Sequence, residues 1–192
     1  EMGIDVIWLM PIHPIGIFNR KGELGSPYSI MDFNEIHPNY GTKEDFKNLV
    51  DIVHSFGMKI IMDWVANHTS WDHVWTNSNP DFYVRDENGK FISPYDWTDV
   101  IQINHENTFA HEALIESMSY WVKKFNIDGY IIPKNDEYFS EYSKNDRLKN
   151  ISNFSGSAGI AVILEKKNYL FIDGRYTIQA EKESAKNFNI IE

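Results

Sequence analysis

The most informative part of the sequence is the stretch Lys59-Ile60-Ile61-Met62-Asp63-Trp64-Val65-Ala66-Asn67-His68. Its opening apolar run indicates a buried strand, and a carboxylate, an amide and an imidazole follow at the carboxyl end. In parallel α/β proteins, ligands bind where the strands end. We therefore expect the chemistry of this protein on the residues that follow this strand.

Strand and helix patterns flank this stretch. Residues 6–10 are an apolar run closed by Pro11, typical of a short buried strand. A helix is expected from Thr42, with Asp45 in a near capping box and Gly57 following as its C-cap. Its predicted apolar face consists of Phe46, Leu49, Val50 and Val53.

A second helix is expected to end near Asn126, before a strand at 129–132. Its apolar stripe consists of Leu114, Ile115, Met118, Trp121, Val122 and Phe125. The predicted strand-to-helix loops, 11–41 and 65–108, are long, whereas the helix-to-strand turns are short. This asymmetry is typical of scaffolds that work at the carboxyl ends of their strands. The loops are rich in aromatic rings, amides and carboxylates, which suit the faces and hydroxyls of sugars.

Composition excludes several classes of protein. The 192-residue chain has no Cys, which excludes disulfides and thiolate metal sites, and its net charge of −10 argues against nucleic-acid binding. No apolar run reaches membrane-spanning length. No signal peptide is visible, so we expect a cytoplasmic protein. The first residues, Glu1 and Met2, indicate a chain entered within a fold.

Composition also changes along the chain. All six Trp and all seven His lie within residues 1–128, which carry 9 basic and 19 acidic residues. Residues 129–192 carry 9 of each. Chance is one explanation of such a shift. Because residue types and charge change together, we expect a domain boundary near 126–130.

Residues 1–128 resemble the α-amylase family of glycoside hydrolases, from the end of the first barrel helix through the third. The resemblance rests on five blocks in order, which are 63–68, Gly25-Ser26-Pro27-Tyr28 with Asp32-Phe33, Tyr40-Gly41-Thr42, Asp45-Phe46, and Phe125-Asn126-Ile127-Asp128-Gly129. It implies a partial (β/α)8-barrel covering the region of strands 2 to 4. It also implies α-glucans or maltooligosaccharides as substrates.

The resemblance implies four site residues. Tyr28 would stack on a sugar, His68 would hydrogen-bond its hydroxyls, and Asp63 would pair with an Arg on the next strand. Asn67 would offer its side-chain oxygen to a weakly bound calcium ion. Taken singly, Asp63 could be a helix cap, Asn67 a turn residue, His68 a buried imidazole and Tyr28 simple core. For Trp71, Asp72, His73 and Trp75, loop packing is as good an explanation as sugar contact.

The catalytic carboxylates that the resemblance implies are not found. The fourth strand of the family continues Gly-Phe-Arg-x-Asp, whereas this chain reads Gly129-Tyr130-Ile131-Ile132-Pro133. Ile131 therefore stands at the Arg position and Pro133 at the nucleophile position, and Asp136 comes three residues too late. Strands five to eight, with the acid/base Glu, are not seen either. We expect no catalytic residue in this chain and no hydrolysis.

Residues 129–192 resemble instead the N-terminal domain of Xaa-Pro aminopeptidases, of the creatinase/aminopeptidase P group. Blocks 129–138, 140–142, Asp146-Arg147, 153–159 and 173–176 carry this resemblance. The residues themselves predict a hairpin of 160–164 and 169–172, tight turns at Gly156, Gly159 and Gly174, a helix over 177–188 and a final strand at 189–192. For Arg147 and Arg175 we favour structural pairing over ligand binding.

The predicted fold class is thus α/β, a partial barrel (1–128) joined to a partial creatinase-type domain (129–192). Three functions compete: an α-glucan glycoside hydrolase by lineage, a peptidase-related module without its metal domain, and a non-catalytic sugar-binding fragment. We favour the first as lineage and the third as the function of the chain itself. We also expect 130–192 to be compact and 1–108 to be mobile or aggregation-prone, because barrel strands left open expose their edges.

Overall fold

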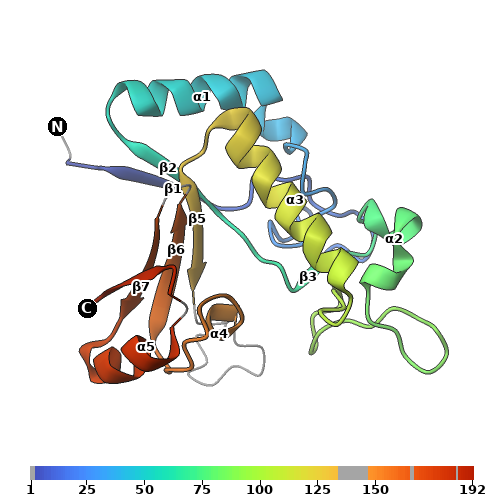
Figure 1. The fold of residues 1–192 in the computed structure, drawn as a ribbon. Helices are drawn as coiled ribbons and strands as arrows, with labels where there is room; N and C mark the ends of the chain where they lie inside the picture. The colour runs from blue at the N-terminus through green and yellow to red at the C-terminus, as the bar shows by residue number, and fades with distance from the viewer. Residues whose placement is uncertain (1–2, 134–146, 165–166, 185) are drawn as a thin grey trace. The chain divides into compact units, whose positions relative to one another are not determined.

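The computed structural model describes residues 3–133, 147–164, 167–184 and 186–192, so Asp136 and Asp146 lie outside the described residues. The chain divides into two compact units, 1–60 with 65–127, and 61–64 with 128–192. The main sheet has the strand order β1-β2-β5-β6-β7-β8, and β3 and β4 form a separate pair. Figure 1 colours these elements along the chain.

The first unit contains both predicted long helices. Its elements are β1 (Val6–Leu9), η1 (Pro38–Tyr40), α1 (Lys43–Ser55), the start of β2 (Lys59–Asp63), β3 (His68–Ser70), α2 (Trp75–Ser78), η2 (Pro80–Phe82), β4 (Val100–Gln102) and α3 (Thr108–Phe125). Thr42 caps α1 in a full capping box with Asp45, as predicted. Gly57 follows the helix with φ of 74°, a left-handed conformation that glycine adopts without strain.

The core of this unit lies where α1 packs against α3. The ring of Phe46 is 5.4 Å from those of both Trp121 and Phe125, and Trp121 Nε1 donates to the carbonyl oxygen of Phe33 at 2.7 Å. The predicted apolar faces were wrong at two residues, because the side chain of Leu49 is 40% exposed and that of Ile115 is 61% exposed. Each lies about 100° round its helix from a buried neighbour in sequence, outside a stripe narrower than predicted.

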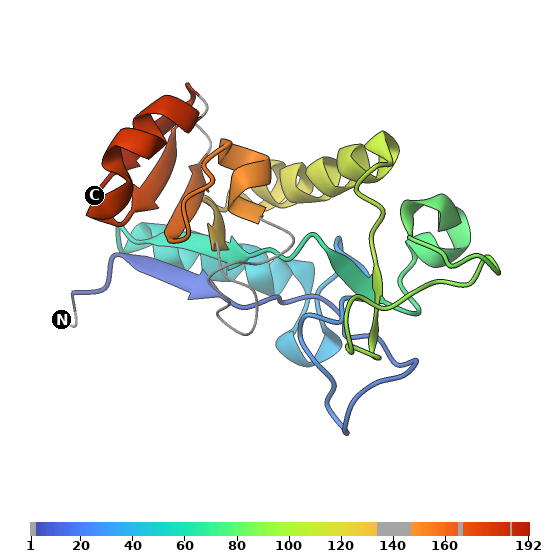
Figure 2. The same cartoon turned by 90° about the horizontal axis from the view of Figure 1, so that it is seen from below.

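The long segment 65–108 is not simply a loop. β3 and β4 pair antiparallel within it, with His68 opposite Gln102, and α2 and η2 lie between them in sequence. The segment 12–31, blue in Figure 2, joins the same region through Ser70 N, which donates to the Ile30 carbonyl oxygen at 2.9 Å. Strands of three residues show no reliable alternation, so the sequence pattern did not predict them.

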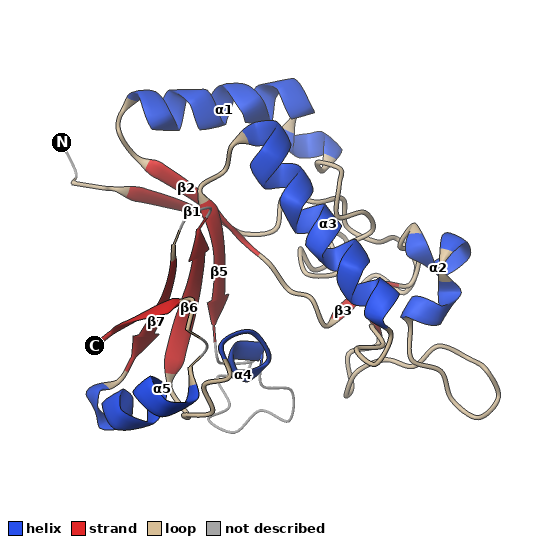
Figure 3. Cartoon of the chain, in the orientation of Figure 1, coloured by secondary structure: helices blue, strands red, loops and turns tan. Residues whose placement is uncertain are grey.

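The second unit is built on a mixed sheet. It contains the end of β2, β5 (Gly129–Pro133), α4 (Arg147–Ser152), β6 (Gly159–Leu164), β7 (Asn168–Ile172), η3 (Gly174–Tyr176), α5 (Thr177–Glu183) and β8 (Phe188–Ile191), shown in Figure 3. β2 and β5 are parallel, as neighbouring barrel strands are. The predicted hairpin is present as β6 and β7, and β6 pairs antiparallel with β5. We expected open edges on the barrel strands of 1–108, but β2 lies between β1 and β5 in the strand order, so β2 is not an edge strand.

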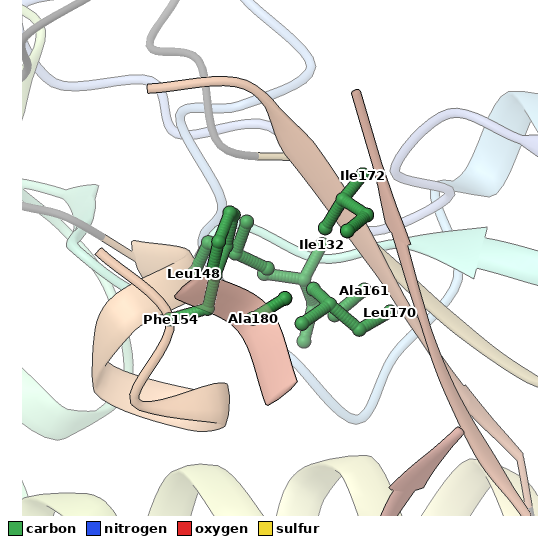
Figure 4. Packing of buried hydrophobic residues seen from close by; sticks show 7 residues of the cluster. All are labelled: Ile132, Leu148, Phe154, Ala161, Leu170, Ile172 and Ala180. Carbon is green, nitrogen blue, oxygen red and sulfur yellow. The ribbon is translucent and has the colours of Figure 1, made fainter. Parts of the chain in front are cut away.

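An apolar cluster fills the space between this sheet and its two helices. Figure 4 shows its members, which are Ile132, Leu148, Phe154, Ala161, Leu170, Ile172 and Ala180. Gly156 is required by close approach, because a Cβ there would lie 2.2 Å from the Phe154 ring. The pairing predicted for Arg175 is confirmed, since its Nε lies 2.9 Å from Asp173 Oδ1.

The predicted helix over 177–188 was too long. α5 ends at Glu183, Ser184 is extended with ψ of 143°, and Phe188 begins β8 opposite Asn168 on β7. The ring of Phe188 packs against the apolar cluster, so burial of an aromatic side chain in the sheet outweighs the polar helical pattern. Among the described helices, none is long and apolar enough to cross a membrane.

Candidate functional site

Asp63 ends β2 and its side chain is buried. In the parallel register of β2 and β5, the Cα partner of Asp63 is Ile131. The resemblance to α-amylases implies an arginine at that position, where a guanidinium would orient the carboxylate. Ile131 offers only hydrocarbon. The register therefore places an apolar residue where the pairing predicted for Asp63 needs a cation.

Pro133 is the last residue of β5 and lies opposite Ile160 of β6. A retaining glycosidase needs a carboxyl nucleophile, and proline has no such group. Directly before Ile131, Tyr130 packs edge-on to Trp64 with ring centroids 5.4 Å apart, and burial raises the pKa of its phenol. The described part of β5 is thus apolar at the positions where the resemblance implies charge.

Asn67 and His68 belong to the first unit, directly before and at the start of β3. The carbonyl oxygen of Asn67 accepts from Ile103 N at 3.0 Å, which ties the turn to the residue after β4. Its side-chain Oδ1 is buried and has no hydrogen-bond partner among the described residues. His68 is buried, and its ring lies edge-on to Trp97 at 5.5 Å.

Trp97 extends this site in a way that the sequence analysis missed. Its half-buried ring lies 5.0 Å from that of Tyr95, which is 57% exposed. Tyr95 has φ of 54°, a left-handed conformation that is rare for an aromatic residue. His68, Trp97 and Tyr95 thus form a row of rings from the interior to the surface. The alternation Tyr95-Asp96-Trp97 in a loop was the available signal.

Tyr28 lies on a loop that is bonded to the same region. Its side chain is half-buried, and its backbone N donates to Ser26 Oγ at 3.2 Å. The next residue, Ser29, donates through Oγ to the Asp99 carbonyl oxygen at 2.9 Å. The loop of Tyr28 and the loop of Trp97 are therefore connected. We call His68, Trp97 and Tyr95 the aromatic platform, and Tyr28 lies on the loop that is bonded next to it.

The neighbouring loop residues prove mainly structural. Trp71 Nε1 donates to the Thr98 carbonyl oxygen at 3.0 Å. Asp72 Oδ2 accepts from the backbone N atoms of Ile17 and Phe18, and these bonds, with one from Ser70, lower its pKa although partial burial opposes them. For these two side chains, loop packing explains the contacts.

His73 lies in the core, and a second buried imidazole accompanies it. Burial lowers the pKa of His73 to about 3, and the charge of nearby His13 acts in the same direction. His13, whose Nδ1 is 3.1 Å from the Glu35 carbonyl oxygen, has its pKa lowered to about 4 by burial. Both imidazoles are therefore neutral at pH 7, which suits packing and not proton transfer at a surface.

A separate pocket of about 590 Å³ lies elsewhere in the first unit. Aromatic rings and carboxylates line it, among them Trp75, Asp81, Phe82, Phe109, Glu112 and Glu116. Of the predicted residues only Trp75 reaches it, so the aromatic platform does not coincide with this pocket.

A calcium ion requires several oxygen ligands. The buried, unpartnered Oδ1 of Asn67 fits one of them, because an uncharged carbonyl oxygen is a normal ligand of this ion. Within the described residues, no group of three or more His, Cys, Asp or Glu side chains could hold a metal ion. Asn67 would therefore need backbone or water oxygens beside it.

The geometry agrees with comparisons to known proteins. The family "Alpha amylase, catalytic domain" matches residues 1–102. Alpha-amylase 3 of Dictyoglomus thermophilum is 29% identical over 167 residues, covering 76% of this chain and 32% of the relative. The amino acid transporter heavy chain SLC3A1 of Homo sapiens is 31% identical over 164 residues, covering 67% and 23%.

Solved structures agree. A maltogenic α-amylase from Thermotoga neapolitana has a TM-score of 0.65 and 44% identity, covering 67% of this chain and 30% of that one. The chain belongs to the α-amylase family of glycoside hydrolases. Its mixed α/β fold resembles a fragment of the family's barrel, and it spans about a third or less of the curated relatives' lengths.

Proposed function

We propose that this chain binds α-glucans without hydrolysing them. The observation that carries the proposal is the register of β5, which places Ile131 beside Asp63 and ends at Pro133. Removing the nucleophile and the orienting cation removes covalent catalysis and the electrostatics that support it. The family also includes a relative named as a transporter heavy chain and not as an enzyme.

The aromatic platform supports the binding half of the proposal. Tyr95 and Trp97 present rings at the surface, and flat rings stack on the apolar faces of sugars. His68 stands behind Trp97, and Tyr28 lies on the connected loop. Maltooligosaccharides are the natural probe, because relatives of this chain are named as α-amylases. Asp63 stays a predicted substrate-binding residue.

Titration calorimetry with maltoheptaose tests binding, and reducing-sugar release tests hydrolysis. We expect weak binding that Trp97→Ala and His68→Ala reduce and that Tyr40→Ala, which removes an exposed ring on η1, leaves unchanged. We expect no sugar release above that of Asp63→Ala. Turnover by the wild-type chain above this control would overturn the proposed inactivity. If Trp97→Ala and His68→Ala bind maltoheptaose as tightly as the wild-type chain does, the proposed site is wrong.

Calcium binding at Asn67 is part of the same proposal. Because Asn67 supplies one uncharged oxygen, we expect a dissociation constant on the order of 10⁻³ M, as in weak extracellular calcium modules. Calorimetry with CaCl₂ should show this binding lost in Asn67→Ala. Asn34, whose Oδ1 is also buried without a partner among the described residues, provides the matched control Asn34→Ala. Micromolar affinity lost in Asn67→Ala would contradict the expected weakness, and an unchanged titration would remove the site.

We further propose that residues 129–192 form a module of separate origin, related to the N-terminal domain of Xaa-Pro aminopeptidases. The antiparallel pairing of β6 with β5 and the unit's own apolar cluster support this proposal. Sequencing the nucleic acid that encodes 126–130 in an independent sample tests the join. A continuation Gly-Phe-Arg-x-Asp in place of 129–133 would contradict it.

A further inference from the structure

Two histidines outside the aromatic platform lie close enough to act together. His105 stands in the turn before α3, and His111 stands in the first turns of that helix. Nδ1 of His105 is 3.1 Å from Nε2 of His111, and the ring centroids are 5.3 Å apart. Both residues are exposed to solvent. We propose that this pair is a chelating site for a divalent transition-metal ion such as Zn²⁺ or Cu²⁺.

The separation of the two nitrogens suits a chelate. Zn²⁺ binds imidazole nitrogen at about 2.0–2.1 Å, so two such ligands stand about 3.3 Å apart at a tetrahedral angle and about 2.9 Å apart at a right angle. The observed 3.1 Å lies between these values. A metal ion bound by both nitrogens would replace the hydrogen that they now share, and each ring would turn by roughly 40° from the line of that hydrogen bond so that both lone pairs meet at the ion.

The surroundings fix the pair in place. The His105 ring also hydrogen-bonds the backbone of Ala66, and a second bond of this kind commonly orients metal-binding histidines. Asn107, between the two histidines, caps α3 by accepting from Phe109 N at 3.0 Å and donates to the Asp81 carbonyl oxygen at 3.0 Å. The turn of His105 and the start of α3, which carries His111, are thus held together by side-chain bonds before any ion binds.

The charge balance and the ligand count set the strength of binding. The positive end of α3 disfavours a cation, whereas Glu106 and Glu112 in the adjoining sequence and the net charge of −10 favour one. Within the described residues, no third His, Cys, Asp or Glu completes the site. Water would fill the remaining positions, so the ion would exchange readily.

Calorimetry with ZnCl₂ on the full chain tests the site. We expect one Zn²⁺ per chain, with affinity weakened at least about tenfold by His111→Ala and by His105→Ala, because a chelate becomes a single ligand. His54→Gln, which alters a histidine of α1, should leave the affinity unchanged. Circular dichroism shows whether each variant is folded. If His105→Ala is unfolded, the result for His111→Ala tests the proposal, because His111 is exposed on a helix and its replacement should not disturb the fold.

A spectroscopic measurement distinguishes metal binding by the two imidazoles from metal binding by surface carboxylates. With Cu²⁺, electron paramagnetic resonance should show coupling to two nitrogens in the wild-type chain and fewer in either variant. Ca²⁺, which prefers oxygen ligands, should not compete with Zn²⁺. Unchanged Zn²⁺ affinity in His111→Ala, or displacement of Zn²⁺ by equal Ca²⁺, would overturn the proposal.

Discussion

Ile131 and Pro133 stand two residues apart on β5, within the unit that also contains Asp63. Ile131 stands where the resemblance implies an arginine, and Pro133 stands where it implies the carboxyl nucleophile. The first substitution leaves out the orienting cation, and the second leaves out the nucleophile. At the scale of single residues, the loss of hydrolysis that we propose thus has two independent causes, and restoring one of them should not restore turnover.

The buried pair His13 and His73 leads to a prediction about acid. Their pKa values in the folded chain are about 4 and about 3, against 6.5 for an ordinary histidine. Because the folded pKa values are lowered, the unfolded chain binds more protons below pH 6.5, and the stability is present above that pH and lost as the pH falls. Between pH 7 and pH 5 each histidine should remove roughly 2 kcal/mol from the free energy of unfolding.

Urea unfolding followed by tryptophan fluorescence at the two pH values measures this loss. His13→Gln and His73→Gln should each flatten the pH dependence while lowering stability at pH 7. His54→Gln is the matched control, because it removes a histidine of α1 that is outside the buried pair. A slope that both core variants share with the wild-type chain would show that other groups cause the acid sensitivity.

At the scale of elements, local signals predicted most of the boundaries. Thr42 and Asp45 form the predicted capping box, and Asn126 ends α3 in the left-handed conformation with φ of 62°. These signals succeed because the caps satisfy backbone groups that the helix itself leaves open. β3 and β4 escaped prediction because three-residue strands form through pairing between segments far apart in sequence.

The candidate site was predictable only where its residues are neighbours in the sequence. Asn67 and His68 were identified from a contiguous motif, whereas Tyr95 and Trp97 join His68 only through the folded loop. Likewise, Phe188 was assigned to a helix because its burial in the apolar cluster cannot be read from neighbouring residues. Tertiary packing outweighs the local pattern at each of these positions.

Gly156 gives a prediction at this scale. Its replacement by Ala places a Cβ 2.2 Å from the Phe154 ring, which is fully buried and has little room to move. We expect Gly156→Ala to destabilise the second unit by about 1–3 kcal/mol, as overpacking of a core does. Gly174→Ala is the matched control, because nothing lies within 4 Å of its added Cβ. Chemical denaturation of the two variants measures the difference, and equal midpoints would contradict the prediction.

At the scale of the whole molecule, we predict uneven stability. β6 and β7 each have hydrogen-bonded neighbours on both sides, whereas β1 ends the strand order and leaves Val6 47% and Trp8 56% exposed. Hydrogen exchange on the full chain should therefore show strong amide protection in 160–164 and 168–172 and weak protection in 6–9. The reverse order, with 6–9 and 59–63 protected and both 160–164 and 168–172 exchanging freely, would refute this prediction.

β5 is parallel to β2 on one side and antiparallel to β6 on the other. A strand used in this way can inherit its two neighbours from different ancestors, since the hydrogen-bonding groups on its two edges are satisfied independently. Recombination at such a strand leaves a continuous sheet, in which no backbone group at the junction lacks a neighbouring strand. Under the separate origin proposed for residues 129–192, β5 would be the strand at which two lineages meet, paired with a barrel strand on one edge and with a hairpin on the other.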